Sequence, residues 1–355
     1  MRAYVAKGIN SADPLSVFSY ILDHPEPTVL ATDTTVLVRI AYAGVNPADL
    51  QYVNGQYEHA PAHPMPRFPS PMGVEGAGVV ARVGSKVSRF KPGDHVMGLH
   101  RRLDEGTFAE IASFEEDELA LKPPGVCWQV AAATPVAGVT ALSALLCCKV
   151  LKAAYEGMAP AHSRSESTAC GDTHAAAGPL GLAAAGAPSP VKSVLILGAS
   201  GGVGSFSVLL AKHFFHIPLV LATCSARNAQ YVQQLGADVT IDYTGEDVEQ
   251  RALQEAQQFA GAAATTCTSP AAEVPACAAV QSQCDSPRKS KPKLDLIIDN
   301  VGGSEHMSMA CRLLSAAGLY VTSVPLADPQ DSSLSSVLSF FVNLGVKKLQ
   351  HKVAY

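Results

Sequence analysis

The sequence has few charged residues, a single tryptophan and no cysteine pair at the short spacing that binds zinc. Only 16% of the 355 residues are charged while 48% are hydrophobic, which argues against a largely disordered chain. The nine cysteines are scattered and include no Cys-x-x-Cys pair, so we expect neither a disulfide framework nor a zinc ribbon. The formal net charge of −5 argues against a general polyanion-binding surface, and we expect no nucleic-acid partner.

The sequence also has no long apolar run and no visible targeting segment. Without a run of about 18 apolar residues, we expect no membrane span. What reads as a first strand follows Met1 directly, with no secretory signal and no Arg- and Ser-rich amphipathic presequence before it. These observations favour a cytoplasmic protein whose cysteines are reduced thiols.

The first third of the chain reads as short strands separated by glycine and proline turns. Val36–Ala43 and Gly78–Val83 are apolar runs that end at glycines, and Val96–Leu99 and Phe108–Ala112 follow. Short strands with little helical periodicity predict a barrel or a sandwich. We therefore expect a β-rich domain over residues 1–134.

Helical periodicity begins near Ala131 and gives way to alternating strands and helices. Ala131–Leu151 predicts a buried helix or helix pair, and Ser193–Leu197 opens a series of βα units. This series predicts a doubly wound parallel sheet in a domain of residues 135–325. Two stretches rich in Ala, Ser, Gly and Pro, at about 153–190 and 259–293, are expected to be disordered insertions. The other predicted elements are helices at Val203–Phe215, Asn228–Leu235 and Glu305–Leu314 and strands at Leu219–Thr223, Val239–Ile241, Leu294–Asp299 and Leu319–Val324.

A glycine-rich turn joins the strand Ser193–Leu197 to an apolar helix. A pyrophosphate must approach backbone N–H groups at the start of a helix, where unpaired donors and the helix dipole favour negative charge. Gly201 and Gly202 leave room for this approach, and Gly204 lets the helix lie close to the sheet. The turn therefore predicts a dinucleotide site, and the alternative is a tight turn in a domain that binds nothing. The residues expected to contact the dinucleotide are Ala199, Ser200, Gly201, Gly202, Val203 and Gly204.

The residues at the end of the second strand of this series indicate which dinucleotide is bound. An NAD enzyme usually places Asp or Glu there, whereas this chain reads Thr-Cys-Ser-Ala-Arg over residues 223–227. The hydroxyl of Ser225 and the guanidinium of Arg227 suit a 2′-phosphate and favour NADPH. The alternative is that Arg227 merely lies on a solvated helix start. Tyr243 is a further candidate to flank the adenine or the phosphate, although tyrosine at a strand end often only packs.

Several segments together resemble the medium-chain dehydrogenases/reductases. The resemblance rests on Gly44–Asp49, Met72–Val80, Phe90–Val96, Ala133–Ala141 and Asp299–Gly303 together with the glycine turn. It covers nearly the whole chain apart from the two insertions. It points to the quinone oxidoreductase branch and, within it, to the reticulon-interacting mitochondrial oxidoreductases. The resemblance implies a GroES-like β-barrel catalytic domain followed by a Rossmann domain that binds NADPH.

The same resemblance argues against a catalytic metal. Alcohol dehydrogenases of this superfamily have Cys where Asn46 stands and His where Val74 stands, which leaves Glu75 and Asp49 without soft or imidazole partners. Their four-cysteine lobe is absent too, since no cysteine precedes Cys127. Without a Lewis acid, we expect hydride transfer to a quinone or an activated enone, whose conjugated system accepts the charge.

The resemblance also assigns individual residues to substrate and cofactor. It places Asn46 and Tyr57 at the substrate, where Asn46 would orient the substrate or ribose and Tyr57 would stack on a planar acceptor or donate a proton. The alternatives are turn capping by Asn46 and rim packing by Tyr57. Thr140 is expected at the nicotinamide or its ribose. Asn300 and Val301 are expected at the carboxyl edge of the sheet, where ligands bind in such folds.

Further expectations concern two histidines, the C-terminal segment, alternative functions, assembly and location. His95 and His100 follow β-turns and are expected to have structural roles. Family members continue past the last Rossmann strand, so residues 326–355 are interpreted as an incomplete return towards the catalytic domain, with a truncated C-terminus. A non-catalytic NADPH-binding or scaffold protein and an enoyl-thioester reductase are the alternative functions. The resemblance further implies a possible homodimer and, as an alternative to the cytoplasm, a mitochondrial location.

Overall fold

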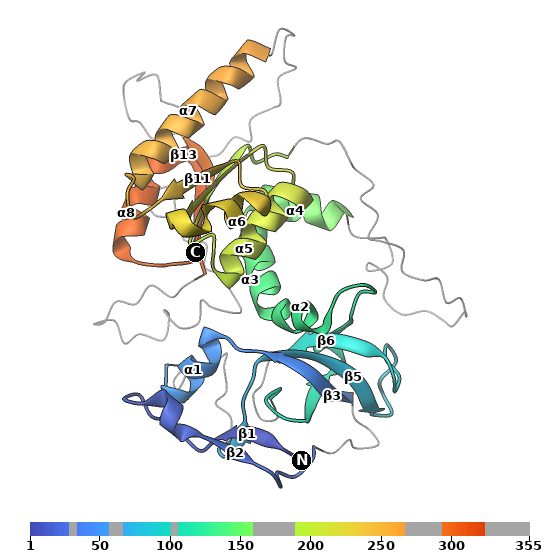
Figure 1. The fold of residues 1–355 in the computed structure, drawn as a ribbon. Coiled ribbons are helices and arrows are strands. Elements are labelled where there is room, and N and C mark those ends of the chain that lie inside the picture. Colours follow the sequence, from blue (N-terminus) through green and yellow to red (C-terminus); the bar gives the residue numbers. More distant parts are fainter. Residues whose placement is uncertain (28–33, 57–66, 101–105, 159–188, 267–292, 324–355) are drawn as a thin grey trace, which may run out of the picture. The chain divides into compact units, whose positions relative to one another are not determined.

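The computed structural model describes residues 1–27, 34–56, 67–100, 106–158, 189–266 and 293–323. The chain divides into two compact units, and the boundary between them falls after Thr140, inside helix α3 (Pro135–Leu146). Figure 1 shows one unit built mainly of strands and another in which helices cover a sheet. Each unit is described by itself below.

The first unit contains a five-stranded antiparallel sheet in the order β7-β3-β5-β6-β8. Alternate residues of its strands point to opposite faces, so Val36 and Val38 of β3 meet Phe114 of β7 in one buried cluster. The strands of this sheet are β3 (Thr35–Gly44), β5 (Glu75–Val83), β6 (His95–Leu99), β7 (Ile111–Glu115) and β8 (Leu119–Leu121).

A smaller sheet and short helices complete the described part of this unit. The sheet has the antiparallel order β2-β1-β4, from β1 (Ala3–Ala6), β2 (Phe18–Ile21) and β4 (Ser70–Pro71). Helix α1 (Pro47–Val53) begins with a proline, whose fixed φ suits the first helical position. Its Tyr52 and Val53 are buried in a cluster with Met72. Helix α2 (Trp128–Ala133) packs Ala131 and Ala132 on Ala77 of β5.

The second unit contains a five-stranded parallel sheet in the order β11-β10-β9-β12-β13. Numbered along the chain this is the doubly wound order 3-2-1-4-5, so the predicted topology is confirmed. The central strand is buried on both faces: Val194 and Ile196 belong to one core cluster, and Leu195 and Leu197 belong to another. Its strands are β9 (Ser193–Leu197), β10 (Leu219–Cys224), β11 (Val239–Asp242), β12 (Leu294–Asp299) and β13 (Leu314–Thr322).

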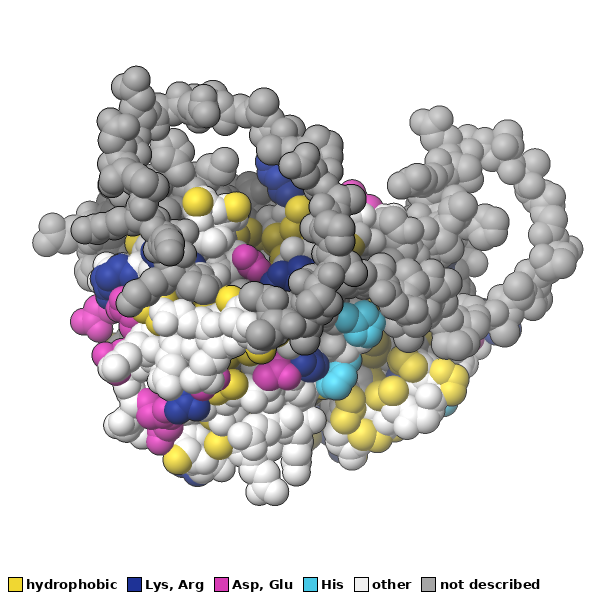
Figure 2. Space-filling model, turned by 90° about the horizontal axis from the view of Figure 1, so that it is seen from above, with side chains coloured by type: hydrophobic (Ala, Val, Ile, Leu, Met, Phe, Trp, Pro, Cys, Tyr) yellow, Lys and Arg dark blue, Asp and Glu magenta, His cyan; other side chains and the backbone are white. Residues whose placement is uncertain are grey.

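Helices cover both faces of the parallel sheet. Residues of α3, α4 (Lys149–Met158), α5 (Gly202–Leu209) and α6 (Ala229–Gln234) pack in the first core cluster. Residues of α7 (Val248–Thr266) and α8 (Ser304–Leu313) pack in the other. A single π-helical turn, Leu210–Phe214, continues α5. Figure 2 shows acidic and basic side chains intermixed on the left and centre of one face, whereas hydrophobic side chains are frequent on its right.

Helices occupy the start of both predicted insertions, which corrects the expectation of disorder there. Residues 153–158 belong to α4 and residues 259–266 belong to α7. Leu151 anchors α4 in the core, and Ala252 and Ala256, one helical turn apart, anchor α7. Alanine favours helix strongly, so the same composition that suggests low complexity also builds these helices. Residues 159–188 and 267–292 of the predicted insertions lie outside the described residues.

Other sequence-based boundaries were wrong too, and the strand predicted at Leu319–Val324 begins at Leu314. The helical stretch expected over Ala131–Leu151 is divided among α2, α3 and α4, because Pro135 cannot donate the backbone hydrogen bond that would continue α2. The strand expected at Phe108–Ala112 begins only at Ile111. Phe108 instead bonds the backbone of Tyr4 and Met72 in an irregular connection.

Within the described residues, no single helix is long and apolar enough to cross a membrane. The pair formed by α3 and residues 149–156 of α4 passes that test of length and composition together, and it is bent by 111°.

Candidate functional site

The glycine turn of the second unit leads from the end of β9 into α5 and differs from one glycine to the next in the room that it leaves for a side chain. Gly198 has a φ of +68°, in the left-handed region that favours glycine. A Cβ atom at Gly204 would overlap the carbonyl oxygen of Gly198 and lie 2.7 Å from the Cα of Ala199. A Cβ at Gly201 would lie 3.4 Å from the Gly198 oxygen and meet nothing closer. The turn is therefore tight on its inner side at Gly204 and open at Gly201.

The neighbouring strand β10 holds this turn in place. The Gly198 N–H donates to Thr223 Oγ1 over 3.1 Å, and the Ala199 N–H donates to the Thr223 carbonyl oxygen over 2.9 Å. These bonds leave Gly201 and Gly202 exposed at the N-terminus of α5, where the first N–H groups of a helix have no intrahelical acceptor. Such a helix start binds anions.

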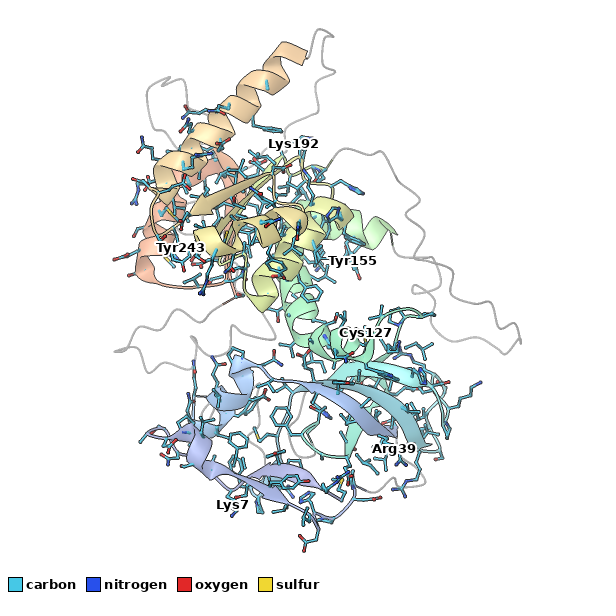
Figure 3. All side chains as sticks on the ribbon, in the orientation of Figure 1. Lys7, Arg39, Cys127, Tyr155, Lys192 and Tyr243 are labelled. Carbon is cyan, nitrogen blue, oxygen red and sulfur yellow. The ribbon has the colours of Figure 1, made fainter. Side chains whose placement is uncertain are left out.

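The predicted phosphate-binding residues lie at the same edge of the parallel sheet. Cys224 pairs with Asp242, so Ser225 and Tyr243, each one residue further along, follow paired strand ends. Arg227 is exposed, and Tyr243 is 59% exposed. Figure 3 shows Tyr243 and Lys192, which precedes β9, towards opposite ends of the sheet.

Asp242 is an acidic neighbour of this edge that sequence reasoning missed. Hydrogen bonds from Thr244, and one from the Ala226 backbone, lower the pKa of its carboxyl, so it is ionised. Its negative charge opposes that of a phosphate, whereas Arg227 favours it. No local motif marks Asp242, since only strand pairing brings it beside residues 224–226.

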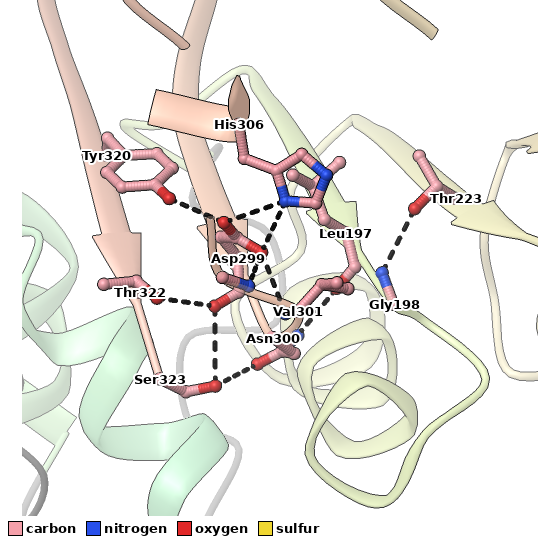
Figure 4. Close-up of polar contacts among 11 residues, drawn as sticks. Leu197, Gly198, Thr223, Asp299, Asn300, Val301, His306, Tyr320, Thr322 and Ser323 are labelled. Carbon is pink, nitrogen blue, oxygen red and sulfur yellow. Dashed lines mark hydrogen bonds and ion pairs between the residues drawn. The ribbon is translucent and has the colours of Figure 1, made fainter. Parts of the chain in front are cut away.

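Asp299 organises the loop at the end of β12 (Figure 4). Its carboxylate is fully buried, and its Oδ1 accepts hydrogen bonds from the backbone N–H groups of Val301, over 2.8 Å, and Gly302, over 2.9 Å. The Tyr320 hydroxyl donates to Oδ2 over 2.6 Å, and His306 Nδ1 lies 3.2 Å from the same oxygen. One buried carboxylate thus shapes the backbone of residues 300–302.

The same loop meets the glycine turn. The Asn300 side chain donates to the Leu197 carbonyl oxygen over 3.1 Å and accepts from the Ser323 hydroxyl over 2.8 Å. A Cβ at Gly198 would come within 2.8 Å of Val301, so the two loops touch. The structure therefore brings Asn300 and Val301, both predicted from sequence, beside the turn whose residues 199–204 were also predicted. The supporting residues Asp299, His306, Tyr320 and Ser323 were not, although an aspartate that ends an apolar strand before two glycines is a usable signal.

Asn46 in the first unit is held by two buried carboxylates. Its backbone N–H donates to Asp49 Oδ2 over 2.7 Å, and its side-chain Nδ2 donates to Glu75 Oε1 over 2.8 Å. Asp49 and Glu75 are each only 2% exposed. Burial raises the pKa of Asp49 to about 6, against the opposing effect of hydrogen bonds from the Asn46 and Val74 backbone. Burial also raises the pKa of Glu75.

The remaining predicted residues are not brought into these clusters. Thr140 is buried in α3, and Tyr57 lies outside the described residues. His95 is exposed and packs on Trp128, whereas His100 is buried and stacks on Phe114 with ring centroids 3.9 Å apart. Among the described residues, no three His, Cys, Asp or Glu side chains form a group that could hold a metal ion.

Comparisons with known proteins agree with this geometry. Residues 32–124 match the family model of the alcohol dehydrogenase GroES-like domain. The chain is 32% identical over 255 residues to a chloroplastic NADPH-dependent alkenal/one oxidoreductase of Arabidopsis thaliana, covering 70% of this chain and 54% of the relative. It is 28% identical over 330 residues to a mitochondrial NAD(P)H oxidoreductase of Homo sapiens, covering 89% and 65%. The chain thus spans between about half and two thirds of these relatives.

A solved structure shares the fold. The quinone oxidoreductase of Pseudomonas syringae pv. Tomato aligns with a TM-score of 0.58 and 25% identity, covering 90% of this chain and 72% of that protein. The match includes the two-part architecture predicted from sequence, a GroES-like domain followed by a doubly wound sheet.

Proposed function

Because the chain belongs to the medium-chain dehydrogenase/reductase superfamily, in the branch of the quinone oxidoreductases, we propose that it is an NADPH-dependent reductase of quinones or activated enones. The observation that carries the proposal is the glycine turn held by Thr223 at the start of α5. The named relatives are an NADPH-dependent alkenal/one oxidoreductase and an NAD(P)H oxidoreductase, which favours the same cofactor here.

The residues at the carboxyl edge of the sheet fit a dinucleotide. Gly201 and Gly202 lie exposed at the helix start, so a pyrophosphate would reach the backbone N–H groups of α5 without meeting a side chain. Ser225 and Arg227 would hold a 2′-phosphate through a hydroxyl and a guanidinium, and Tyr243 would flank the adenine or the phosphate. Asn300 and Val301 would border the nicotinamide side, because their loop touches Gly198.

The reaction that we propose is hydride transfer to a conjugated acceptor. Bound NADPH supplies the hydride. An amide at Asn46 and an isopropyl group at Val74 are not zinc ligands, so the acceptor itself must delocalise the developing charge. Asn46 would orient the acceptor by hydrogen bonding, and Thr140 would contact the nicotinamide or its ribose. Tyr57 is the proposed stacking or proton-donating residue.

A cofactor titration tests the first half of the proposal. Purified protein is titrated with NADPH and with NADH, followed by fluorescence, beside Arg227→Ala and the control Arg39→Ala. Arg39 is an exposed arginine on β3 (Figure 3), matched in charge but in the other unit. We expect Arg227→Ala to weaken NADPH binding about tenfold, with little change for NADH, since a charge-assisted bond to the phosphate is lost. Failure of the wild-type protein to bind either nucleotide would contradict the proposal.

A turnover assay tests the second half. NADPH consumption is followed with a quinone, an alkenone and an enoyl thioester as separate acceptors. We expect consumption with the quinone or the alkenone. NADPH binding without consumption would identify a non-catalytic NADPH-binding protein, and a preference for the thioester would identify an enoyl-thioester reductase.

Location and assembly belong to the same proposal. The relatives named above are chloroplastic and mitochondrial, which favours an organelle over the cytoplasm. Fluorescence imaging of the tagged full-length protein checks the location. Light scattering of the purified protein checks for the homodimer that the family resemblance implies.

A further inference from the structure

Glu75 is a buried carboxylate in the first unit that accepts two hydrogen bonds, one at each oxygen. Its Oε1 accepts the Asn46 Nδ2–H over 2.8 Å, and its Oε2 accepts the backbone N–H of Val136 over 2.7 Å. Val136 is the second residue of α3, where the helix dipole also favours a negative charge. A Cβ at Gly44 would overlap Glu75 Oε1, so only glycine at the end of β3 leaves room for this arrangement.

Glu75 determines which end of the Asn46 amide faces it. A carboxylate only accepts hydrogen bonds, so the Nδ2 end must point to Glu75, and the Oδ1 end is turned away from it. Asn46 is also the N-cap residue of α1 and forms a capping box with Asp49, which accepts the Asn46 backbone N–H and, over 3.1 Å, the Val74 N–H. The cap places Asn46 at the start of α1, and the charge of Glu75 selects which end of its amide faces the carboxylate.

Stability alone does not explain a charge at this place. Within the described part of the chain, Glu75 forms no ion pair with a lysine, arginine or histidine, and burial of an unpaired carboxylate is costly. A neutral side chain would fill the same space at a lower cost in desolvation. The charge is better explained by its effect on the amide that it contacts.

We propose that Glu75 is a positioning residue that fixes the orientation of the Asn46 side-chain amide towards the substrate. This inference rests on the proposed function, which assigns Asn46 to the substrate. Glu75 itself touches the Asn46 amide and the start of α3, and it acts on the substrate only through Asn46.

An exchange of the two side-chain types separates positioning from stability. In Glu75→Gln, the glutamine oxygen can accept from Val136 while its Nε2 faces Asn46, so the Asn46 amide must turn over to keep its contact. In the double variant Asn46→Asp with Glu75→Gln, the new glutamine accepts from Val136 and donates to the new aspartate, which keeps both hydrogen bonds with one of them reversed. We expect Glu75→Gln to lower kcat/KM for the enone about tenfold, mainly through kcat, with little change in Tm.

The double variant tests whether activity needs the amide at position 46. We expect its Tm to stay near the wild-type value while kcat/KM stays about tenfold low, because an aspartate replaces that amide. Recovery of wild-type kcat/KM would overturn the inference, because the amide that Glu75 is proposed to orient would then be dispensable.

A glycine pair gives a test that leaves both side chains unchanged. Gly44→Ala displaces the Glu75 carboxylate, whereas Gly8→Ala adds a Cβ with nothing within 4 Å. We expect Gly44→Ala to lower kcat/KM in the same way and Gly8→Ala to leave it unchanged. Equal activity of the two variants would count against positioning.

A spectroscopic readout keeps the inference separate from the proposed function. In ¹⁵N-labelled protein, the two side-chain NH₂ protons of Asn46 should be widely separated in the wild type, because one of them faces a carboxylate. We expect this separation to shrink in Glu75→Gln. Unchanged Asn46 resonances would overturn the inference, whereas a wild-type protein that shows the shift but turns over no acceptor would overturn only the proposed function.

Discussion

The two units hold their candidate site residues by different means. In the second unit the groups offered to a ligand are mainly backbone N–H groups, arranged by a glycine turn that β10 and the loop after β12 support. In the first unit the candidate group is a side-chain amide at Asn46, held by two buried carboxylates. The first arrangement needs small residues at fixed spacing, and the second needs particular partners from distant parts of the chain.

This difference decides which substitutions matter in each unit. A backbone site is lost when a Cβ closes it or when the support of its loop is removed. A side-chain site is sensitive instead to the charge and hydrogen-bonding type of its partners, because their shape can be kept while their donors and acceptors change. Substitutions of both kinds, with expected effects that range from about 4 kcal/mol to about a threefold change in affinity, test this difference.

Replacing Asp299, the buried carboxylate that supports the loop after β12, should change the free energy of unfolding more than any other substitution considered. Asp299→Ala leaves the N–H groups of Val301 and Gly302 and the Tyr320 hydroxyl without their acceptor. We expect a loss of about 4 kcal/mol in the free energy of unfolding, measured with urea, together with loss of NADPH binding. Tyr320→Phe, which removes one donor only, should cost about 1 kcal/mol. Equal losses in both variants would show that the carboxylate is not the centre of this network.

Alanine substitutions at two glycines of the turn should have different effects on stability and on NADPH binding. Gly204→Ala places a Cβ against the Gly198 carbonyl, and overpacking of this kind costs about 3 kcal/mol, so stability and NADPH binding should both fall. Gly201→Ala adds a Cβ with only an ordinary contact, so it should weaken NADPH binding while Tm changes little. Thermal unfolding and nucleotide titration of both variants check this, and unchanged NADPH affinity in Gly201→Ala would place the pyrophosphate elsewhere.

The same contrast explains how much could be predicted from the sequence. The β9–turn–α5 segment is contiguous, so its strand, its glycines and its helix start were all predicted, and the doubly wound parallel sheet was predicted from the βα series. In the first unit Asn46 was identified through a family resemblance, but Glu75 contacts it from 29 residues away and Val136 from 61 residues beyond Glu75. No periodicity or spacing encodes such contacts.

Alanine is frequent both in disordered segments and in helices, so composition alone gave a wrong prediction at two places. The alanine-rich start of each predicted insertion is helical, because Leu151 in α4 and Ala252 in α7 reach a core that only the folded chain provides. Asp242 was missed for a related reason, since its position beside residues 224–226 follows from strand pairing. Tertiary contacts, which local patterns do not contain, decide both cases.

The stability of the protein should depend on pH through the carboxylates of the first unit, because a site made of backbone N–H groups does not titrate. Burial raises the folded-state pKa of Asp49 from 3.8 to about 6, so its contribution to stability is fully present below pH 4 and is lost as the pH rises through 6. His100 acts in the opposite direction, because burial lowers its pKa to about 3 and its contribution is lost as the pH falls below its unfolded value. The comparison that isolates Asp49 is therefore wild type against Asp49→Asn.

We expect the wild-type protein to lose about 2 kcal/mol relative to Asp49→Asn between pH 4 and pH 7, from urea unfolding at each pH. Glu75, whose pKa burial also raises, is present in both proteins and largely cancels in the difference. A pH-independent difference between the two proteins would show that Asp49 does not titrate in this range.

The smallest expected effect concerns charge at the edge of the parallel sheet. Asp242 is ionised and accepts a hydrogen bond from the backbone of Ala226, which lies between Ser225 and Arg227 in the sequence, so Asp242→Asn removes a repulsion that a 2′-phosphate would experience and NADH would not. The carboxylate is partly exposed, which limits the gain to about threefold in NADPH affinity, smaller at high salt. Titrations of both nucleotides at two salt concentrations measure it, with the exposed Asp247→Asn as the matched control. An equal gain for NADH would place the 2′-phosphate away from β11, and the selectivity would then depend on Arg227 alone.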